Sequence, residues 1–284
     1  MGYPPKNCPF LSPGDSGGLA GTTPPVQQSA YYLVMFKLFC AVVCCGVLSS
    51  CTSPPEAPVL RPQGAQAHAV TASRLDALLP TDALLLGEQH DVSEHQQIHQ
   101  QVIALLAERT LLGALVLEMA DKGTGTAKLH PSSTEQQAKK ALKWSDTGWP
   151  WEAYGPAVMT AVRAGVPVVG GNLPRGSMQS SMNDGKLDGQ LPGPALKAQQ
   201  QLIRIGHCNL LPESQITPMT RIQIAKDISM AETVNDMAVP GKVVVLLAGG
   251  GAAAEKNNAF NAVWATPAVA EKDYCADFKA QMGK

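Results

Sequence analysis

Four short apolar runs, each closed by glycine or polar residues, constrain the fold of this chain most strongly. They are Ala83–Leu86, Ala114–Leu117, Val166–Val169 and Lys242–Leu247. Strands that are apolar on both faces belong in a parallel sheet covered by helices. Patterns typical of helices separate the runs, over residues 93–109, 152–164, 196–205 and 217–237. The alternation predicts an α/β fold, a three-layer α/β/α domain with a mainly parallel central sheet.

Polar residues stand where these strands end. They are Glu88 and His90, Glu118, and Asn172 with Arg175. In open parallel sheets, ligands bind outside the carboxyl ends of the strands. We therefore expect the five side chains to converge on one crevice, although glycines after strands are also ordinary turn residues.

Two histidines follow in the first helix, for which Ser93 is the expected N-cap. His95 falls on the apolar stripe that points inward, so it could ligate a metal or contact a cofactor. It could equally be a buried histidine that is paired with a carboxylate. His99 lies one turn later, towards the edge of the stripe, and carries less weight.

Aromatic residues gather just before the second helix. The chain is only 5% aromatic, yet Trp144, Trp149, Trp151 and Tyr154 lie within eleven positions. Such a cluster suits a flat apolar ligand, or simply a helix docked on the sheet. The Tyr154 hydroxyl could ligate ferric iron, which is a known axial option for haem.

The N-terminal region has the layout of a bacterial lipoprotein signal. Met35-Phe36-Lys37 precedes the apolar run Leu38–Val47, and Leu48-Ser49-Ser50 leads to Cys51. Acyl chains on Cys51 would hold the mature protein at a membrane surface. A transmembrane anchor is the alternative, but Lys37 would sit in its middle.

This layout predicts four segments. Residues 1–34 either precede the true start of the protein, at Met35, or form a disordered extension, and residues 35–50 are the signal peptide. Residues 51–67 form a flexible tether rich in Pro and Ala, and residues 68–284 form one domain.

Two cysteines, Cys208 and Cys275, follow Cys51 in the chain. Export makes a disulfide between them plausible, with two unpaired buried thiols as the alternative. The formal net charge of −1 gives no basic balance, so nucleic acid is not an expected partner.

Four blocks of residues, in order, resemble the ChaN-like haem-binding lipoproteins of the TraB/Tiki superfamily. The blocks are Gly87-Glu88-Gln89-His90-Asp91 with His95, Trp149-Pro150-Trp151 with Tyr154 and Pro156, Gly165–Val169 with Asn172–Arg175, and Gln223, Asp227, Met230 and Ala231. The resemblance covers nearly all of residues 78–280. It implies a ChaN/EreA-like fold and haem held between two protomers, hence a homodimer, with a tyrosine as iron ligand.

The chain departs from the family after its last predicted strand. The family has a Gly-x-x-His motif there and a Gly-Val-Pro stretch, whereas this chain reads Gly249-Gly250-Gly251-Ala252. A lost histidine harms a metal-dependent hydrolase more than a haem carrier, which needs an apolar slot and as little as one axial ligand.

The sequence therefore predicts an outer-membrane lipoprotein that binds haem for iron uptake, a binding protein rather than an enzyme. The expected site residues are Glu88, His90, His95, Glu118, Asn172 and Arg175, with Tyr154 on the iron. The alternatives are a Tiki-type metal-dependent hydrolase that uses Glu88, His90 and Glu118, and a degenerate family member that binds no ligand.

Overall fold

A computed structural model describes residues 63–249, 262–265 and 273–282. The predicted signal peptide, Cys51 and Ala252 lie outside these residues. Within the described part of the chain, every helix is too short or too polar to cross a membrane.

The centre of the fold is a five-stranded parallel sheet in the order β3-β2-β4-β1-β5. The predicted α/β class and the parallel sheet are thereby confirmed. A fifth strand, β5, was not predicted. The strands are β1 (Ala83–Glu88), β2 (Leu112–Asp121), β3 (Val168–Asn172), β4 (Val243–Gly249) and β5 (Ala262–Ala265).

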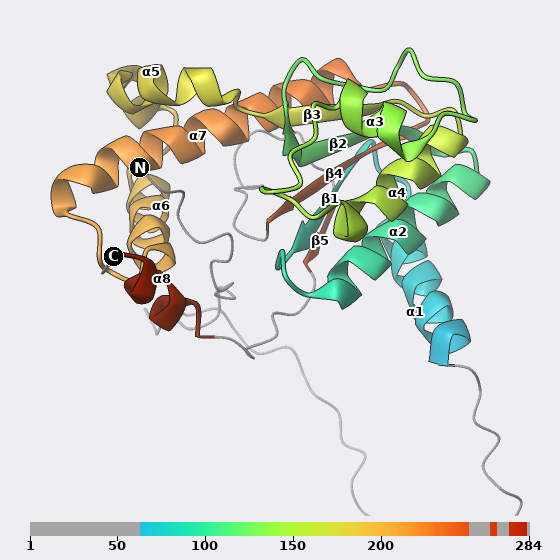
Figure 1. The fold of residues 1–284 in the computed structure, drawn as a ribbon, viewed down its shortest axis with the longest axis horizontal. Coiled ribbons are helices and arrows are strands. Elements are labelled where there is room, and N and C mark those ends of the chain that lie inside the picture. Colours follow the sequence, from blue (N-terminus) through green and yellow to red (C-terminus); the bar gives the residue numbers. More distant parts are fainter. Residues whose placement is uncertain (1–62, 250–261, 266–272, 283–284) are drawn as a thin grey trace, which may run out of the picture. The chain divides into compact units, whose positions relative to one another are not determined.

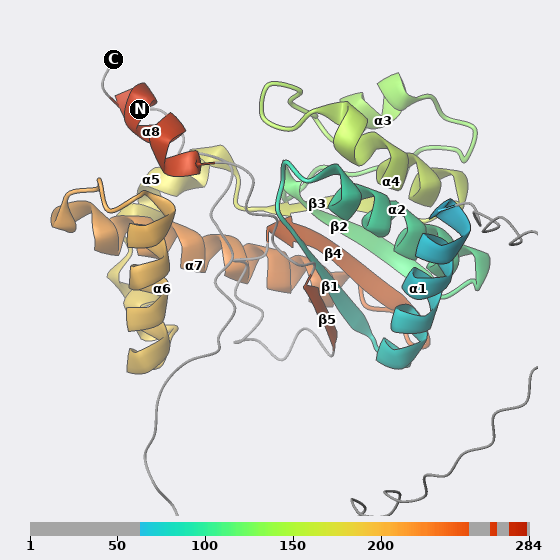
Figure 2. The same cartoon turned by 90° about the horizontal axis from the view of Figure 1, so that it is seen from below.

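Alternate residues of each central strand pack on opposite faces of the sheet. Leu84 and Leu86 join the core with α1 (Gln63–Leu78), α2 (Ser93–Glu108) and α4 (Trp151–Arg163), whereas Ala83 and Leu85 join the core with α7 (Glu213–Asp236). Figures 1 and 2 show the sheet between these layers. Burial on both faces explains why the strands lack polar alternation.

The remaining helices are α3 (Glu135–Ala141), η1 (Arg175–Ser177), α5 (Met178–Asn183), η2 (Gly185–Gly189), α6 (Gly193–Gly206) and α8 (Tyr274–Met282). Two details differ from the sequence-based expectation. Helix α1 begins at Gln63, inside the segment predicted as tether, because Pro62 is the last proline of that segment and alanines, which favour helix, follow it. Val92 is the N-cap of α2 in place of Ser93, and no side chain caps this end.

The predicted disulfide joins Cys208, directly after α6, to Cys275 in α8, 67 residues later. We expect both cysteines to resist alkylation in denatured protein until a reductant is added. Closing a loop of this length restricts the unfolded chain, so the Cys208→Ser/Cys275→Ser protein should lose about 4 kcal/mol of unfolding free energy. Urea unfolding with and without reductant measures the loss. Free labelling of both thiols without reductant would contradict the bridge.

Candidate functional site

Glu88 ends β1 with its side chain fully buried, and four polar groups surround its carboxylate. The His90 Nδ1 and Tyr154 hydroxyl each lie 2.6 Å from Oε1, and the Gln96 amide donates to Oε2 at 3.3 Å. His99 Nδ1 lies 3.2 Å from Oε2, close enough for an ion pair. A buried charge is tolerated only with such partners, so Glu88 is the hub of the site.

His90 is oriented by Glu88 through Nδ1, and its other nitrogen, Nε2, lies at the carboxyl end of β4. A β-carbon placed on Gly249 would come within 2.9 Å of Nε2, so the absence of a side chain at Gly249 lets the imidazole lie close to β4. The ring of Trp149 meets the imidazole edge-on at 4.7 Å. A carboxylate bonded to one imidazole nitrogen is typical of histidines that bind a metal through the other nitrogen.

Charges at the site reinforce one another. Burial alone would raise the pKa of Glu88, but contacts with His90 and His99 bring this pKa far below its ordinary value of 4.5. Burial would likewise lower the pKa of His90, yet the bond to Glu88 and the charges of Glu118, Glu88 and Asp91 raise it above 6.5. Both shifts have the same origin, because each group stabilises the charged form of its partner.

Glu118 and Asn172 connect the neighbouring strands at the same edge of the sheet. The Glu118 carboxylate accepts a hydrogen bond from the Gly249 amide at 2.7 Å, which ties β2 to β4. The Asn172 side-chain amide donates to the Glu118 carbonyl at 2.8 Å, which ties β3 to β2. Glu88, Glu118 and Asn172 thus lie at the carboxyl edge of the sheet, as predicted from the sequence.

Tyr154 lies beneath the site instead of on its surface. Only 1% of the residue is exposed, and Trp144 and Trp149 pack around its ring. Burial, together with the charge of Glu88 and its hydrogen bond, raises the pKa of Tyr154. The phenol is therefore a protonated donor to Glu88, and it would have to leave this partner to bind iron.

His95 is buried as expected, and its Nδ1 accepts a hydrogen bond from the Gln89 amide at 3.0 Å. It thereby shapes the turn that carries His90. Arg175 is exposed at the start of η1, and its part in ligand binding stays a prediction.

Sequence reasoning undervalued His99 and missed Gln96. His99 is 1% exposed, and among the described residues neither of its nitrogens has a well-aligned hydrogen bond. Its four-residue spacing from His95 was the one signal that it faces the same way. Gln96 donates to the His90 carbonyl at 3.2 Å as well as to Glu88, and no sequence motif marks it.

The side chains of the site suit metal binding by one imidazole, that of the largely buried His90, better than by several residues together. Among the residues that the structure describes, no group of three or more His, Cys, Asp or Glu side chains is placed to hold a metal ion. Nε2 of His90 offers a lone pair once its proton leaves, next to an indole ring and a glycine. A planar ligand with a metal at its centre has the matching chemistry.

Comparisons with known proteins show the family of the chain. A search of curated proteins found no match. A solved structure of ChaN of Campylobacter jejuni, described as showing cofacial haem binding, is similar with 25% identity and a TM-score of 0.50, over 63% of this chain and 74% of that chain. The family model described as haem-binding uptake, Tiki superfamily, ChaN matches residues 74–258, about two thirds of the chain. The chain therefore belongs to the ChaN family of haem-binding uptake proteins in the Tiki superfamily.

Proposed function

We propose that this protein binds haem at the carboxyl edge of its sheet and serves haem or iron uptake. Family membership supports the ligand class, and the Glu88–His90 pair is the observation that carries the site. The described residues fit haem in two respects: a carboxylate holds Nδ1 of His90, which favours a metal at the other nitrogen, and the Trp149 ring flanks that imidazole.

His90 is our proposed axial ligand, in place of Tyr154. A hydrogen bond from Nδ1 to a carboxylate makes the opposite nitrogen more basic, which favours iron at Nε2. Tyr154, by contrast, is buried and donates its proton to Glu88. In this proposal Tyr154 supports His90 indirectly, by holding Glu88 in position.

Titration of the purified protein with haemin, followed in the visible spectrum, tests the proposal. We expect a Soret shift that saturates at a fixed haem-to-protein ratio and carries the signature of histidine ligation. A weak spectrum that never saturates would show haem on an apolar surface only and would favour the degenerate, non-binding reading. A tyrosinate charge-transfer band would restore Tyr154 as ligand.

Pairing of two copies belongs to the same proposal. The relative is described as binding haems cofacially, which supports haem-linked association of protomers here. Sedimentation velocity with and without haemin would detect it. An unchanged monomer at saturating haem would reject a homodimer.

Anchoring at the outer membrane through acylated Cys51 is the last part of the proposal, and Leu48–Cys51 supports it. Cys51→Ser should abolish acylation and release the protein from the membrane fraction, because each buried methylene contributes about 0.8 kcal/mol to membrane binding. Fractionation followed by mass spectrometry of the N-terminal peptide measures both effects. An unacylated variant that still fractionates with membranes would favour a transmembrane anchor.

A further inference from the structure

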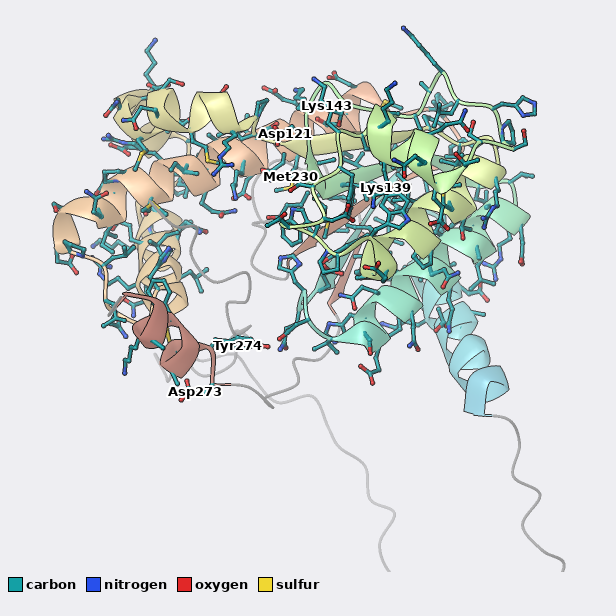
Figure 3. The ribbon with its side chains drawn as sticks, in the orientation of Figure 1. Asp121, Lys139, Lys143, Met230, Asp273 and Tyr274 are labelled. Carbon is teal, nitrogen blue, oxygen red and sulfur yellow. A yellow bond between two sulfur atoms is a disulfide. The ribbon has the colours of Figure 1, made fainter. Side chains whose placement is uncertain are left out.

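Helix α8 reaches back to the turn that carries His90. The Gln89 side-chain amide donates to the Tyr274 hydroxyl at 2.6 Å. That hydroxyl in turn lies 2.8 and 2.7 Å from the two carboxylate oxygens of Asp91, to which it donates. Gln89 and Asp91 are the immediate neighbours of His90, so Tyr274 (labelled in Figure 3) binds the turn on both sides of the proposed ligand.

The next residue after Tyr274 fixes α8 covalently. Cys275 is bonded to Cys208, which follows α6. Phe278, one turn later, is buried and meets the ring of His207 edge-on at 6.1 Å. The first turn of α8 is therefore tied to α6 by the disulfide of Cys275, and to the His90 turn by the hydrogen bonds of Tyr274.

The contacts of α8 lie outside the residues that the family model matches. The family match ends at residue 258, before α8 begins. On its other side the same turn is held by α2, through His95 to the Gln89 amide and through Gln96 to the His90 carbonyl. The turn is thus fixed between α2, which belongs to the matched region, and α8, which does not.

We propose that Tyr274 is a positioning residue for His90, and that the Cys208–Cys275 disulfide makes this positioning depend on redox state. We name the arrangement the α8 clasp: the Tyr274 contacts to Gln89 and Asp91, together with the disulfide. A dithiol would open it by reducing the S–S bond. Two electrons and two protons pass to Cys208 and Cys275, and the dithiol becomes a disulfide.

Loss of the disulfide raises the entropic cost of the Tyr274 contacts, because α8 must then be ordered without its covalent link. Buried and partly buried hydrogen bonds to a charged group contribute more than neutral ones. The turn should therefore loosen when either the hydroxyl or the disulfide is removed, and His90 would lose its fixed orientation.

Hydrogen–deuterium exchange of the full-length protein without haem tests the clasp directly. Tyr274→Phe keeps the ring and removes the hydroxyl, and should speed exchange over residues 88–92 by about tenfold. Wild type with dithiothreitol, and Cys208→Ser/Cys275→Ser, should do the same. Lys279→Gln, an exposed change on the same helix, is the matched control and should leave exchange unaltered.

Combination of the two changes distinguishes a clasp from independent contacts. If the disulfide acts through Tyr274, reducing the Tyr274→Phe protein should add little to its exchange rate. Fully additive effects, or unchanged exchange in Tyr274→Phe, would overturn the proposal.

The haem readout rests on the proposed function and is separable from the exchange readout. In Tyr274→Phe and in reduced wild type we expect up to about tenfold weaker haemin binding with an altered ligand spectrum. This is the lower end of the cost of losing a direct partner of a metal-binding histidine, because Tyr274 acts on His90 only through Gln89 and Asp91. Loosened exchange with an unchanged haem spectrum would overturn the positioning role. If wild type itself binds no haem, the proposed function fails, and exchange still decides whether the clasp exists.

Discussion

His90→Ala will weaken haem binding by at least about 100-fold. Loss of an outer partner of a metal-binding histidine costs 10–100-fold in affinity, so loss of the histidine itself should reach or exceed the upper value. The variant keeps Trp149, which can hold haem only by apolar contact. Haemin titration should show the Soret shift replaced by a weak, non-saturating spectrum, and added imidazole should restore part of it.

Dependence on pH gives the same assignment a second test. Burial lowers the pKa of His90, but the bond to Glu88 and the nearby carboxylates raise it above its ordinary value, so a proton competes with iron for Nε2 up to a higher pH than in a free imidazole. Haem affinity of wild type should therefore increase as the pH rises through the folded-state pKa of His90. His90→Ala should lose this slope.

Tyr154→Phe is the matched control for His90→Ala, because it removes one donor to Glu88 and keeps the aromatic ring. We expect its haem spectrum to keep the histidine signature with a moderate loss of affinity. The opposite pattern, a normal spectrum in His90→Ala and a lost band in Tyr154→Phe, would make Tyr154 the ligand. Stoichiometric zinc or manganese that disappears with peptide hydrolysis in His90→Ala would favour the hydrolase instead.

Strand positions were predictable because burial on both faces leaves an unbroken apolar run. Ala83–Leu86 corresponds to β1, which extends two residues further to Glu88. Strand β3 begins two residues later than expected, at Val168, and continues through two glycines to Asn172. Strand β5 was missed because a run of four residues is too short to stand out, and its pairing with β1 involves residues far apart in sequence.

The carboxyl edge was predictable for the same reason: topology brings the ends of parallel strands together. Glu88, Glu118 and Asn172 could be assigned to it from strand positions alone. Contacts between side chains of different layers could not be predicted from the sequence. Tyr274 lies 185 residues from Gln89, and Tyr154 reaches Glu88 over 66 residues, distances at which helical or strand periodicity carries no information.

Glu88→Gln will be the most destabilising conservative change at the site. The Glu88 carboxylate accepts hydrogen bonds from His90, Tyr154 and Gln96. The side-chain amide of glutamine would replace one accepting oxygen by an NH2 group, which would face another donor. Removing one partner of a buried ion pair costs about 3–5 kcal/mol, because the other charge stays buried without compensation. Urea unfolding without haem measures this loss, and haem affinity should fall by about 10–100-fold as His90 loses its orienting partner.

The effect should depend on pH in a defined direction. The folded pKa of Glu88 is lowered, so its stabilisation is complete above the ordinary value of 4.5 and is lost as the pH falls towards the folded value. The folded pKa of His90 is raised, so its stabilisation is complete below 6.5 and is lost as the pH rises through the folded value. The difference between wild type and Glu88→Gln should therefore be largest between about pH 4.5 and 6.5.

Glu232→Gln is the control for this prediction. Glu232 also pairs with a cation, Lys122 at 2.9 Å, but 60% of its side chain is exposed. Solvent screens such a pair, so this change should cost at most about 1 kcal/mol and show no maximum between the two pH values. Equal losses in the two variants, or parallel pH profiles, would mean that Glu88 is not the buried hub of the site. A large loss confined to Glu88→Gln would show that the charge holding His90 in place also stabilises the fold, because the same hydrogen bonds join β1, α2 and α4.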